Sequence, residues 1–481
     1  MSTNSNTNRK TNADGPLRLY NTQTRTVEPL ETIESGKVRM YVCGVTVYDS
    51  AHIGHGMSAI IFDVIRRYLE HRGYAVRHAQ NFTDVDDKII ARSQRDGIDP
   101  DELVEGLIAD WHRELAALNI LPATVYPRAT QEIPQIIQMI EGLIAKGHAY
   151  VVEGDVYYRV RSFPGYGKLS HRNVDDLLAG ARIEVDERKE DPLDFALWKA
   201  AKPGEPTWSS PWSDGRPGWH IECSAMCSRH LGGVVDIHGG GADLIFPHHE
   251  NEIAQSEAYL GQEPFARYWV HNGWLQLGGE KMSKSLGNVI NLSELIGLGL
   301  APAFRLMVLQ SHYRAPFTFT EDVLMAAQNG LDRLRAAASD STSDDGDATA
   351  RSGELDAMIA ATDERFHVAM DDDFNTPVAV AALFDLARAI NREAATERAS
   401  GSVAAARTTL HQLAGVLGLD LQEQAPAASA DAEPFVELLI SVRTDLRDAK
   451  QWALADRIRD GLEHLGVTLE DTAAGTTWRR R

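Results

Sequence analysis

The sequence predicts an α/β protein in which a parallel sheet is interrupted by an insertion and followed by helices. Three observations lead to this prediction. A strand-like run at 38–43 is followed by an amphipathic helix and then by a second strand-like run at 74–82. Sheet-like patterning returns only near 234–237, and beyond residue 320 the apolar residues recur at helical spacing. The order strand, helix, strand is typical of parallel sheets, because parallel neighbours need a crossover connection.

The first strand leads through a glycine turn into the helix. The strand ends at Cys43 and Gly44, and the tetrapeptide His52-Ile53-Gly54-His55 stands at the start of the helix. One face of that helix carries the apolar residues Ile60, Ile61, Val64, Ile65, Tyr68 and Leu69. Ligands of parallel sheets bind at the carboxyl ends of the strands, so Cys43, Gly44 and Thr83 should lie near a ligand.

An insertion separates the two parts of the predicted sheet. Helical patterning begins near residue 118, and a hairpin-like stretch follows at 150–160. The strand at 234–237 then leads into Gly239-Gly240-Gly241, and a later loop between glycines carries Lys281-Met282-Ser283-Lys284-Ser285. The sheet domain is therefore split in the sequence.

Two stretches of low complexity divide the helical half. Residues 336–353 and 424–433 are too polar to bury much surface, so we interpret them as flexible connections. Helical periodicity runs from Glu321 to Leu334 and from Val378 to Ile390. A final compact piece ends the chain.

Composition narrows the class of protein. With 481 residues the chain should hold two to four domains. A net charge of -21 argues against unselective binding of polyanions, although it permits an RNA-binding enzyme with a local basic face. The first 15 residues lack an apolar core, and no apolar run approaches the roughly 20 residues that span a bilayer, so we expect a cytoplasmic protein. The three cysteines, Cys43, Cys223 and Cys227, favour metal binding or buried thiols over disulfides.

The histidine and lysine motifs suit the handling of phosphates. His52 and His55 stand at a helix start, where unpaired N–H groups and the helix dipole favour anions, and Gly54 permits close approach. Lys281 and Lys284 lie in a glycine-flanked loop that could close over phosphates. Either motif alone is as well explained by solvated side chains. Both in this order rarely arise by chance, and together they resemble the two signatures of class I aminoacyl-tRNA synthetases, which implies ATP activation and a contact from Lys284.

A second group of residues suits a metal ion. His248 and Glu252, at positions i and i+4, should project from one helical face. Cys43 and Cys223 would complete a set of ligands for zinc, and Cys43 lies close upstream of His52, so the metal would lie near the nucleotide. Singly, each cysteine is more often a core residue and each helical pair a surface pair. Cys227 shares a helical face with Cys223 and could compete with it.

Several segments resemble the cysteinyl-tRNA synthetase family over nearly the whole chain. They are 40–44, 81–88, 218–223, 239–252 and the lysine motif. The resemblance implies a Rossmann-like parallel-sheet catalytic domain with an insertion, a helical bundle and a small C-terminal anticodon-binding module. It also implies that one zinc ion is held by Cys43, Cys223, His248 and Glu252, with Cys227 a packed thiol.

The same resemblance divides the chain into expected domains. They are a disordered tail at 1–16, the first half of the catalytic domain at 17–118, a connective insertion at 119–217, the second half with the lysine loop and a stem-contact region at 218–320, a helical bundle at 321–424 with its polar linker at 336–353, and the anticodon-binding module at 434–481.

The expected substrate contacts follow the motifs. The nucleotide contacts are Gly44, Thr46, His52, Gly54, His55 and Lys284, and the catalytic residues are His52, His55, Lys281 and Lys284. Thr83 and Asp243 should hold the amino acid or adenylate, with Asp243 suited to the α-ammonium, and Trp219 should wall the thiol pocket. His220 and His249 are expected to add donors near the phosphates.

The expected reaction joins cysteine to tRNA(Cys). ATP with magnesium would activate the cysteine carboxylate, and a monomer is expected. A cysteine thiolate binds zinc where serine offers only a weak ligand, which fits the lack of any sign of an editing domain. Two alternatives remain: a cysteine ligase of mycothiol synthesis, which joins cysteine to an amino sugar, and a non-catalytic zinc-binding paralogue. The long C-terminal half and the segment 189–199 oppose the ligase, and the intact histidine and lysine motifs oppose the paralogue.

Overall fold

The structure is a computed structural model. The residues it describes are 16–173, 188–278, 280–281, 290–339, 352–395, 401–422, 432–464, 467–472 and 475–480. The predicted tail up to residue 15, most of both polar connections and Lys284 lie outside them. The chain forms two compact units, Met1–Leu421 and Gln422–Arg481.

A four-stranded parallel sheet forms the centre of the first unit, as predicted. Its order is β10-β9-β3-β4, made of β3 (Lys37–Thr46), β4 (Ala75–Thr83), β9 (Val235–Gly241) and β10 (Ala266–Asn272). From β3 the chain crosses to β4 on one side, whereas β9 lies on the other side of β3. Such a reversal of strand order opens a crevice at the carboxyl ends of the strands, where ligands bind.

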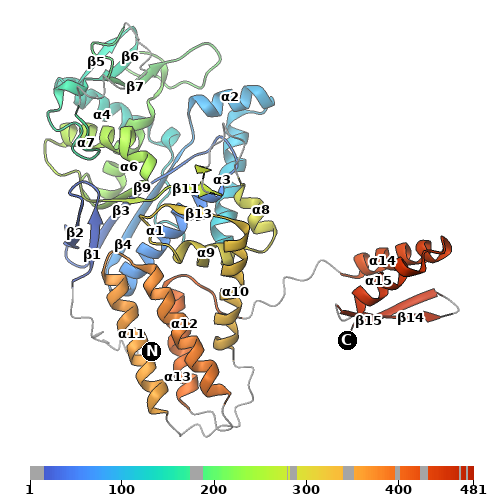
Figure 1. Cartoon of the computed structure of the whole chain (residues 1–481). Helices are drawn as coiled ribbons and strands as arrows, with labels where there is room; N and C mark the ends of the chain where they lie inside the picture. The colour runs from blue at the N-terminus through green and yellow to red at the C-terminus, as the bar shows by residue number, and fades with distance from the viewer. Residues whose placement is uncertain are drawn as a thin grey trace, which may run out of the picture. The chain divides into compact units, whose positions relative to one another are not determined.

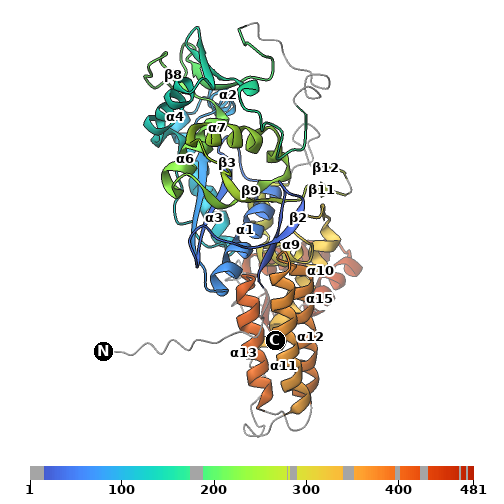
Figure 2. The same cartoon turned by 90° about the vertical axis from the view of Figure 1, so that its left-hand side faces the viewer.

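Helices cover both faces of this sheet (Figures 1 and 2). One face carries α1 (Ile53–His71), α3 (Pro100–Ala117) and α9 (Ala301–Leu309). The other carries α4 (Ile133–Ala145), α6 (Trp219–Leu231) and α7 (Glu250–Leu260). The buried side chains accordingly form two large clusters, and β3 alternates between them.

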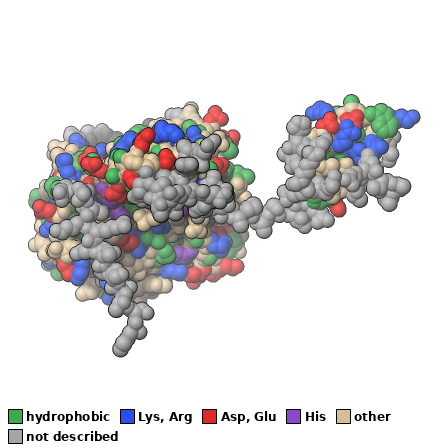
Figure 3. Space-filling model, turned by 90° about the horizontal axis from the view of Figure 1, so that it is seen from below, with side chains coloured by type: hydrophobic (Ala, Val, Ile, Leu, Met, Phe, Trp, Pro, Cys, Tyr) green, Lys and Arg blue, Asp and Glu red, His purple; other side chains and the backbone are tan. Residues whose placement is uncertain are grey.

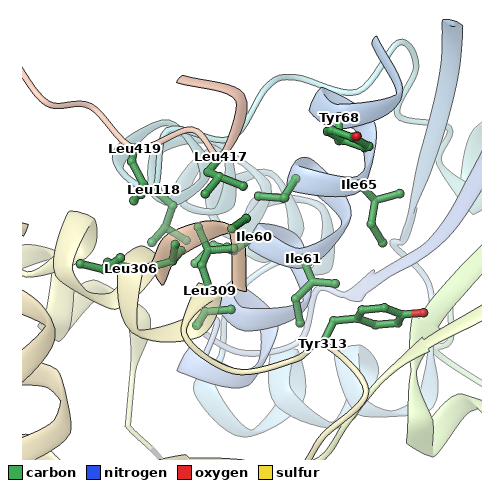
Figure 4. Packing of buried hydrophobic residues seen from close by; sticks show 14 of the residues in the cluster. Ile60, Ile61, Ile65, Tyr68, Leu118, Leu306, Leu309, Tyr313, Leu417 and Leu419 are labelled. Carbon is green, nitrogen blue, oxygen red and sulfur yellow. The ribbon is translucent and has the colours of Figure 1, made fainter. Parts of the chain in front are cut away.

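The first cluster joins the central parallel sheet to the helices that follow it. Figure 4 shows Ile60 of α1 next to Leu306 and Leu309 of α9, with Leu118, Leu417 and Leu419 on the same side and Ile61 and Ile65 on the side of Tyr313. The apolar face predicted for α1 is therefore the face that packs.

Smaller elements complete the first unit. The insertion between β4 and β9 holds an antiparallel sheet in the order β5-β6-β7-β8, made of β5 (Ala149–Val152), β6 (Asp155–Tyr158), β7 (Phe195–Ala200) and β8 (Gly215–Pro217). Further strands and α-helices of this unit are β1 (Arg18–Asn21), β2 (Thr26–Pro29), α2 (Asp87–Asp96), β11 (Leu275–Leu277), β12 (Glu280–Lys281), α8 (Leu292–Gly297) and β13 (Phe317–Phe319).

Four helices form a bundle after the sheet. They are α10 (Glu321–Ala338), α11 (Gly353–Asp371), α12 (Thr376–Ala394) and α13 (Ser402–Val416), seen side by side in Figure 1. The second unit consists of α14 (Ala432–Asp448), α15 (Trp452–His464) and a hairpin of β14 (Val467–Thr472) and β15 (Gly475–Arg480).

The surface is mixed in charge. Figure 3 shows acidic and basic side chains interspersed over the face that it presents. In the described part of the chain, every helix is too short or too polar to cross a membrane.

Candidate functional site

A bulge at the end of β3 sets the position of Cys43. The strand does not end at Gly44 as predicted but continues to Thr46, and its register against β4 shifts between Val42 and Val45. A β-bulge redirects a side chain out of the regular alternation. At Gly44 a Cβ atom would lie 1.7 Å from the carbonyl oxygen of Asn81, so only glycine fits there. The Asn81 Oδ1 atom accepts a hydrogen bond from the Gly44 N–H at 2.9 Å, which holds the bulge against β4.

Four predicted metal ligands meet beside this bulge. The ligand atoms of Cys43, Cys223, His248 and Glu252 all lie within 4.8 Å of one another. The two sulfur atoms are 3.8 Å apart, and Cys43 Sγ is 3.3 Å from Glu252 Oε1. His248 Nε2 is 3.1 Å from the same carboxylate oxygen. Two thiols, an imidazole and a carboxylate at this spacing fit a tetrahedral ion of borderline softness such as zinc.

The pKa shifts of these four side chains are compatible with a metal ion that takes the place of protons on them. A hydrogen bond from Cys43 lowers the pKa of Cys223 to about 6, whereas burial raises the pKa of Cys43 well above its usual range. Burial disfavours charge on His248 and on Glu252, but their mutual attraction prevails. It raises the pKa of His248 to about 10, and His238 with His248 holds the pKa of Glu252 well below its usual range. Thiolate and carboxylate are the forms that bind metal ions.

Further histidines hold the ligands in place. Metal ligands usually make a second hydrogen bond that fixes their orientation. Here His238 Nε2 lies 2.8 Å from Glu252 Oε2, and His220 Nδ1 lies 3.0 Å from His248 Nδ1. His249 Nδ1 lies 2.8 Å from His271 Nε2. The ligand atoms of a second set, Cys43, His238, His249 and Glu252, also lie within 4.8 Å of one another, but this set has only one sulfur atom.

These contacts add residues that the sequence interpretation missed. His238 and His271 were not expected near the metal site, since a lone histidine inside a buried strand carries no spacing signal. Of the two histidines expected near the phosphates, His220 contacts the proposed ligand His248, and His249 contacts His271. Trp219, 37% exposed, stacks on His248 with ring centroids 4.2 Å apart, so it lies beside the thiol cluster.

The His52 motif forms the amino-terminal cap of α1. His52 Nδ1 accepts a hydrogen bond from the Gly54 N–H at 3.1 Å, and His55 Nδ1 accepts one from the His52 N–H at 3.2 Å. A neutral imidazole that accepts at Nδ1 carries its proton on Nε2. In this cap, each ring therefore carries an Nε2–H group that can donate a hydrogen bond. Both groups lie at a helix end whose dipole favours phosphate.

The lysine loop ends near this cap. On its near side, Lys281 of β12 pairs with Gln276 of β11. On its far side, the Ile53 N–H donates to the Ile290 carbonyl at 3.1 Å and the Leu292 N–H donates to the Ala51 carbonyl at 2.9 Å. The chain that carries Lys284 is thus anchored to the segment that carries His52, although Lys284 itself lies outside the described residues.

Other predicted contacts lie around the same sheet edge. Thr46 and His55 line a small hollow beside α3 that is open to solvent. Buried Thr83, at the end of β4, donates its hydroxyl to Glu222 Oε2 at 2.9 Å. Burial and the neighbouring Cys223 raise the pKa of Glu222 well above its usual range. Asp243 lies exposed in a short turn after β9, over Gly241.

Comparisons with known proteins give a consistent result. Residues 29–329 match the tRNA synthetase class I (C) catalytic domain, and residues 365–422 match the DALR domain. A cysteine–tRNA ligase of Dehalococcoides mccartyi is 53% identical over 463 residues, which cover 96% of this chain and 99% of the relative. A cysteine–tRNA ligase of Desulfitobacterium hafniense is 49% identical over 472 residues, with 96% and 99% covered.

A solved structure supports the fold. The methionyl-tRNA synthetase of Mycobacterium tuberculosis, in complex with methionyl-adenylate, superposes with a TM-score of 0.58 at 17% identity. The match covers 79% of this chain and 89% of that one. At this identity the likeness shows a shared architecture of sheet and helices.

Proposed function

This chain belongs to the cysteine–tRNA ligase family of class I aminoacyl-tRNA synthetases, and from that premise we propose which residues bind each substrate and which assist the reaction. The substrates of this family are cysteine, ATP and tRNA. Relatives of this name match over 96% of the chain, including its C-terminal half. Neither a ligase for an amino sugar nor a non-catalytic paralogue is favoured by that match.

We propose that Cys43, Cys223, His248 and Glu252 hold one zinc ion that selects the substrate thiol. The donor set and its distances support this assignment. When bound, zinc offers a coordination position that a thiolate fills far better than an alcohol. The bulge at Gly44, His238 and His220 orient the ligands, and Trp219 covers one side.

We propose that His52 and His55 stabilise the charge on the phosphates during activation. The cysteine carboxylate attacks the α-phosphorus of ATP, and the bond to the bridging oxygen breaks to release pyrophosphate. Negative charge grows on the phosphate oxygens, and the Nε2–H donors set by the helix cap are positioned to stabilise it. Lys281 and Lys284 are proposed to neutralise the leaving pyrophosphate, with magnesium accompanying ATP. Gly44, Thr46 and Gly54 are the proposed remaining nucleotide contacts.

In the second step a terminal hydroxyl of tRNA attacks the carbonyl carbon of the adenylate, and AMP leaves. We propose that the stem-contact region before residue 321 and the helical bundle contact the tRNA and that the second unit reads the anticodon. We propose that the enzyme acts as a monomer. Translation takes place in the cytoplasm, where we propose that the enzyme works.

One observation carries this proposal. The thiols of Cys43 and Cys223 and the histidine cap of α1 lie at the same edge of the parallel sheet, where its strands end. The proposal is tested by cysteine-dependent exchange of pyrophosphate into ATP, with zinc-loaded protein and with protein stripped by a chelator. The proposal predicts exchange with cysteine, none with serine, and loss on stripping that added zinc restores. Equal exchange in the stripped protein would contradict the role of the metal.

A further inference from the structure

Helix α2 is bound to the insertion through its first residue (Figure 1). Asp87 Oδ2 lies 2.7 Å from Lys199 Nζ of β7, and Asp87 Oδ1 pairs with Arg216 of β8. Burial disfavours a charge on Asp87, but Lys199 and Arg216 prevail and lower the pKa of its carboxyl. The Arg216 side chain is 5% exposed and has Glu205 as its second acid, 3.6 Å away. Because a buried guanidinium needs carboxylates beside it, this contact fixes the start of α2.

The same helix contacts the segment 45–51, which directly precedes the cap of α1. Lys88 and Arg92 stand at positions i and i+4, so they share one face of α2. Lys88 Nζ lies 5.1 Å from the centre of the Tyr48 ring, and Arg92 Nη1 lies 2.9 Å from Asp49 Oδ1. Helix α2 therefore joins the insertion to this segment.

On the side of α3 the segment is loosely packed. Most of residues 45–51, together with His55, line the hollow beside α3 that is open to solvent. Glu114 of α3 lies in the same lining and is 7% exposed, yet its Oε2 atom has no hydrogen-bond partner in the described part of the chain. A hollow supplies fewer contacts than a packed core and restrains its lining weakly. The contacts with α2 therefore fix the segment more than those with α3 do.

The position of this segment matters because it ends at the cap that aims the His52 and His55 rings. At the other end of α2, strand β8 leads through Gly218 into α6, which carries Cys223. Helix α2 thus bridges the chain that enters α1 and the chain that enters α6. These two chains carry the phosphate donors and a thiol ligand of the proposed site, and a misplacement of about 1 Å between such groups can lower a rate about 100-fold.

We propose that Lys88 and Arg92 are positioning residues, which hold the segment 45–51 and thereby aim the donors of the histidine cap, and that Asp87 anchors α2 to the insertion for this task. This inference rests on the proposed function and deepens it, because it assigns a role in activation to residues on a helix outside the two motifs.

Arg92→Met tests the contact with the segment, because methionine keeps much of the bulk and removes the charge. In cysteine-dependent pyrophosphate exchange by the zinc-loaded full chain, kcat should fall roughly 10-fold. The fall is smaller than that for a 1 Å misplacement because Lys88 still contacts the segment. The KM values for cysteine and ATP and the zinc content should stay within about twofold, since the donors act on charge that grows in the transition state.

A double-mutant cycle with His52→Asn separates positioning from a general loosening of the fold. If Arg92 acts through the cap, its substitution matters less once the donor at position 52 is gone. The loss caused by Arg92→Met should then shrink from roughly 10-fold to less than about threefold. A loss by the same factor in both backgrounds would show a role in structure alone and overturn the inference.

The far end of α2 gives an independent test. Asp87→Asn weakens the contact with the insertion and should lower kcat by a factor similar to that of Arg92→Met; should it not fold, the more exposed Lys199→Met should lower kcat about threefold. Arg95→Met is the matched control. Arg95 pairs with Asp96 as Arg92 does, but its side chain is 67% exposed, so kcat should stay within about twofold.

The outcomes distinguish this inference from the function on which it rests. A slow His52→Asn enzyme beside an Arg92→Met enzyme with the kcat of the wild type would overturn the inference and leave the proposed function in place. Wild-type protein without cysteine-dependent exchange would remove both together.

Discussion

Substitution of Gly44 by alanine should disable the site by a backbone collision. The new Cβ would lie 1.7 Å from the Asn81 carbonyl oxygen, whereas carbon and oxygen atoms normally approach no closer than about 3.3 Å. The bulge of β3 must therefore move from β4 by about 1.6 Å, the difference between these distances. This movement would stretch the hydrogen bond of 2.9 Å between the Gly44 N–H and Asn81 Oδ1.

The movement would affect both stability and catalysis. Overpacking of this kind typically costs about 1–3 kcal/mol of unfolding free energy. Cys43 is the neighbour of Gly44, so its sulfur would shift relative to Cys223 and Glu252. A shift of about 1 Å in an active site can lower the rate about 100-fold. We therefore expect Gly44→Ala to lose zinc affinity and at least about 100-fold in kcat/KM for pyrophosphate exchange.

The assay combines urea unfolding, zinc content and exchange kinetics. Gly106→Ala is the matched control, because Gly106 lies within α3 and a Cβ there would meet no atom within 4 Å. That variant should be as stable as the wild type or more stable by up to about 1 kcal/mol. A Gly44→Ala protein with wild-type unfolding midpoint and exchange rate would refute the reasoning about the bulge.

Three further predictions concern the helix that carries the histidines and the lysine loop. Arg305→Met should lower the unfolding free energy by about 3–5 kcal/mol in urea titrations, because it removes one of the two arginine partners of buried Asp63 and the donors to two buried carbonyls; a loss under 1 kcal/mol would contradict this. His52→Asn should keep the cap of α1 through its side-chain oxygen and unfold like the wild type, yet slow exchange roughly 10- to 100-fold, since the Nε2 donor is gone; exchange at the wild-type rate would speak against that donor. Lys284→Ala should slow adenylate formation in single-turnover assays while the zinc content stays constant. A loss of zinc would contradict the assignment of phosphate contact and metal binding to different residues.

The sheet could be predicted from the sequence because its signals are local. The apolar spacing from Ile60 to Leu69 and the glycine after Cys43 indicate a strand and a helix by themselves. The continuation of β3 to Thr46 could not be predicted in this way. The bulge depends on Asn81, which contacts Gly44 only after β4 has paired with β3.

The metal ligands show a different limit. Cys43, Cys223 and His248 come from three separate elements. Singly, each cysteine is more often a core residue, and a helical pair such as His248 with Glu252 is more often a surface pair. The family resemblance, rather than the spacing of these residues in the sequence, predicted that they form one set of ligands. In the structure their ligand atoms lie close together. The outer partners stayed hidden because a histidine such as His238 or an acid such as Glu222 is recognised only by what it contacts in space.

The central claim is that the thiol cluster at Cys43 and Cys223 selects cysteine. The most direct measurement is the kcat/KM for charging of tRNA(Cys) with cysteine and with serine, side by side, for the wild type and for Cys223→Ser. The account predicts that the wild type strongly prefers cysteine and that Cys223→Ser loses most of this preference, while the KM for ATP stays within about threefold. A Cys223→Ser enzyme that still prefers cysteine as strongly as the wild type would contradict it.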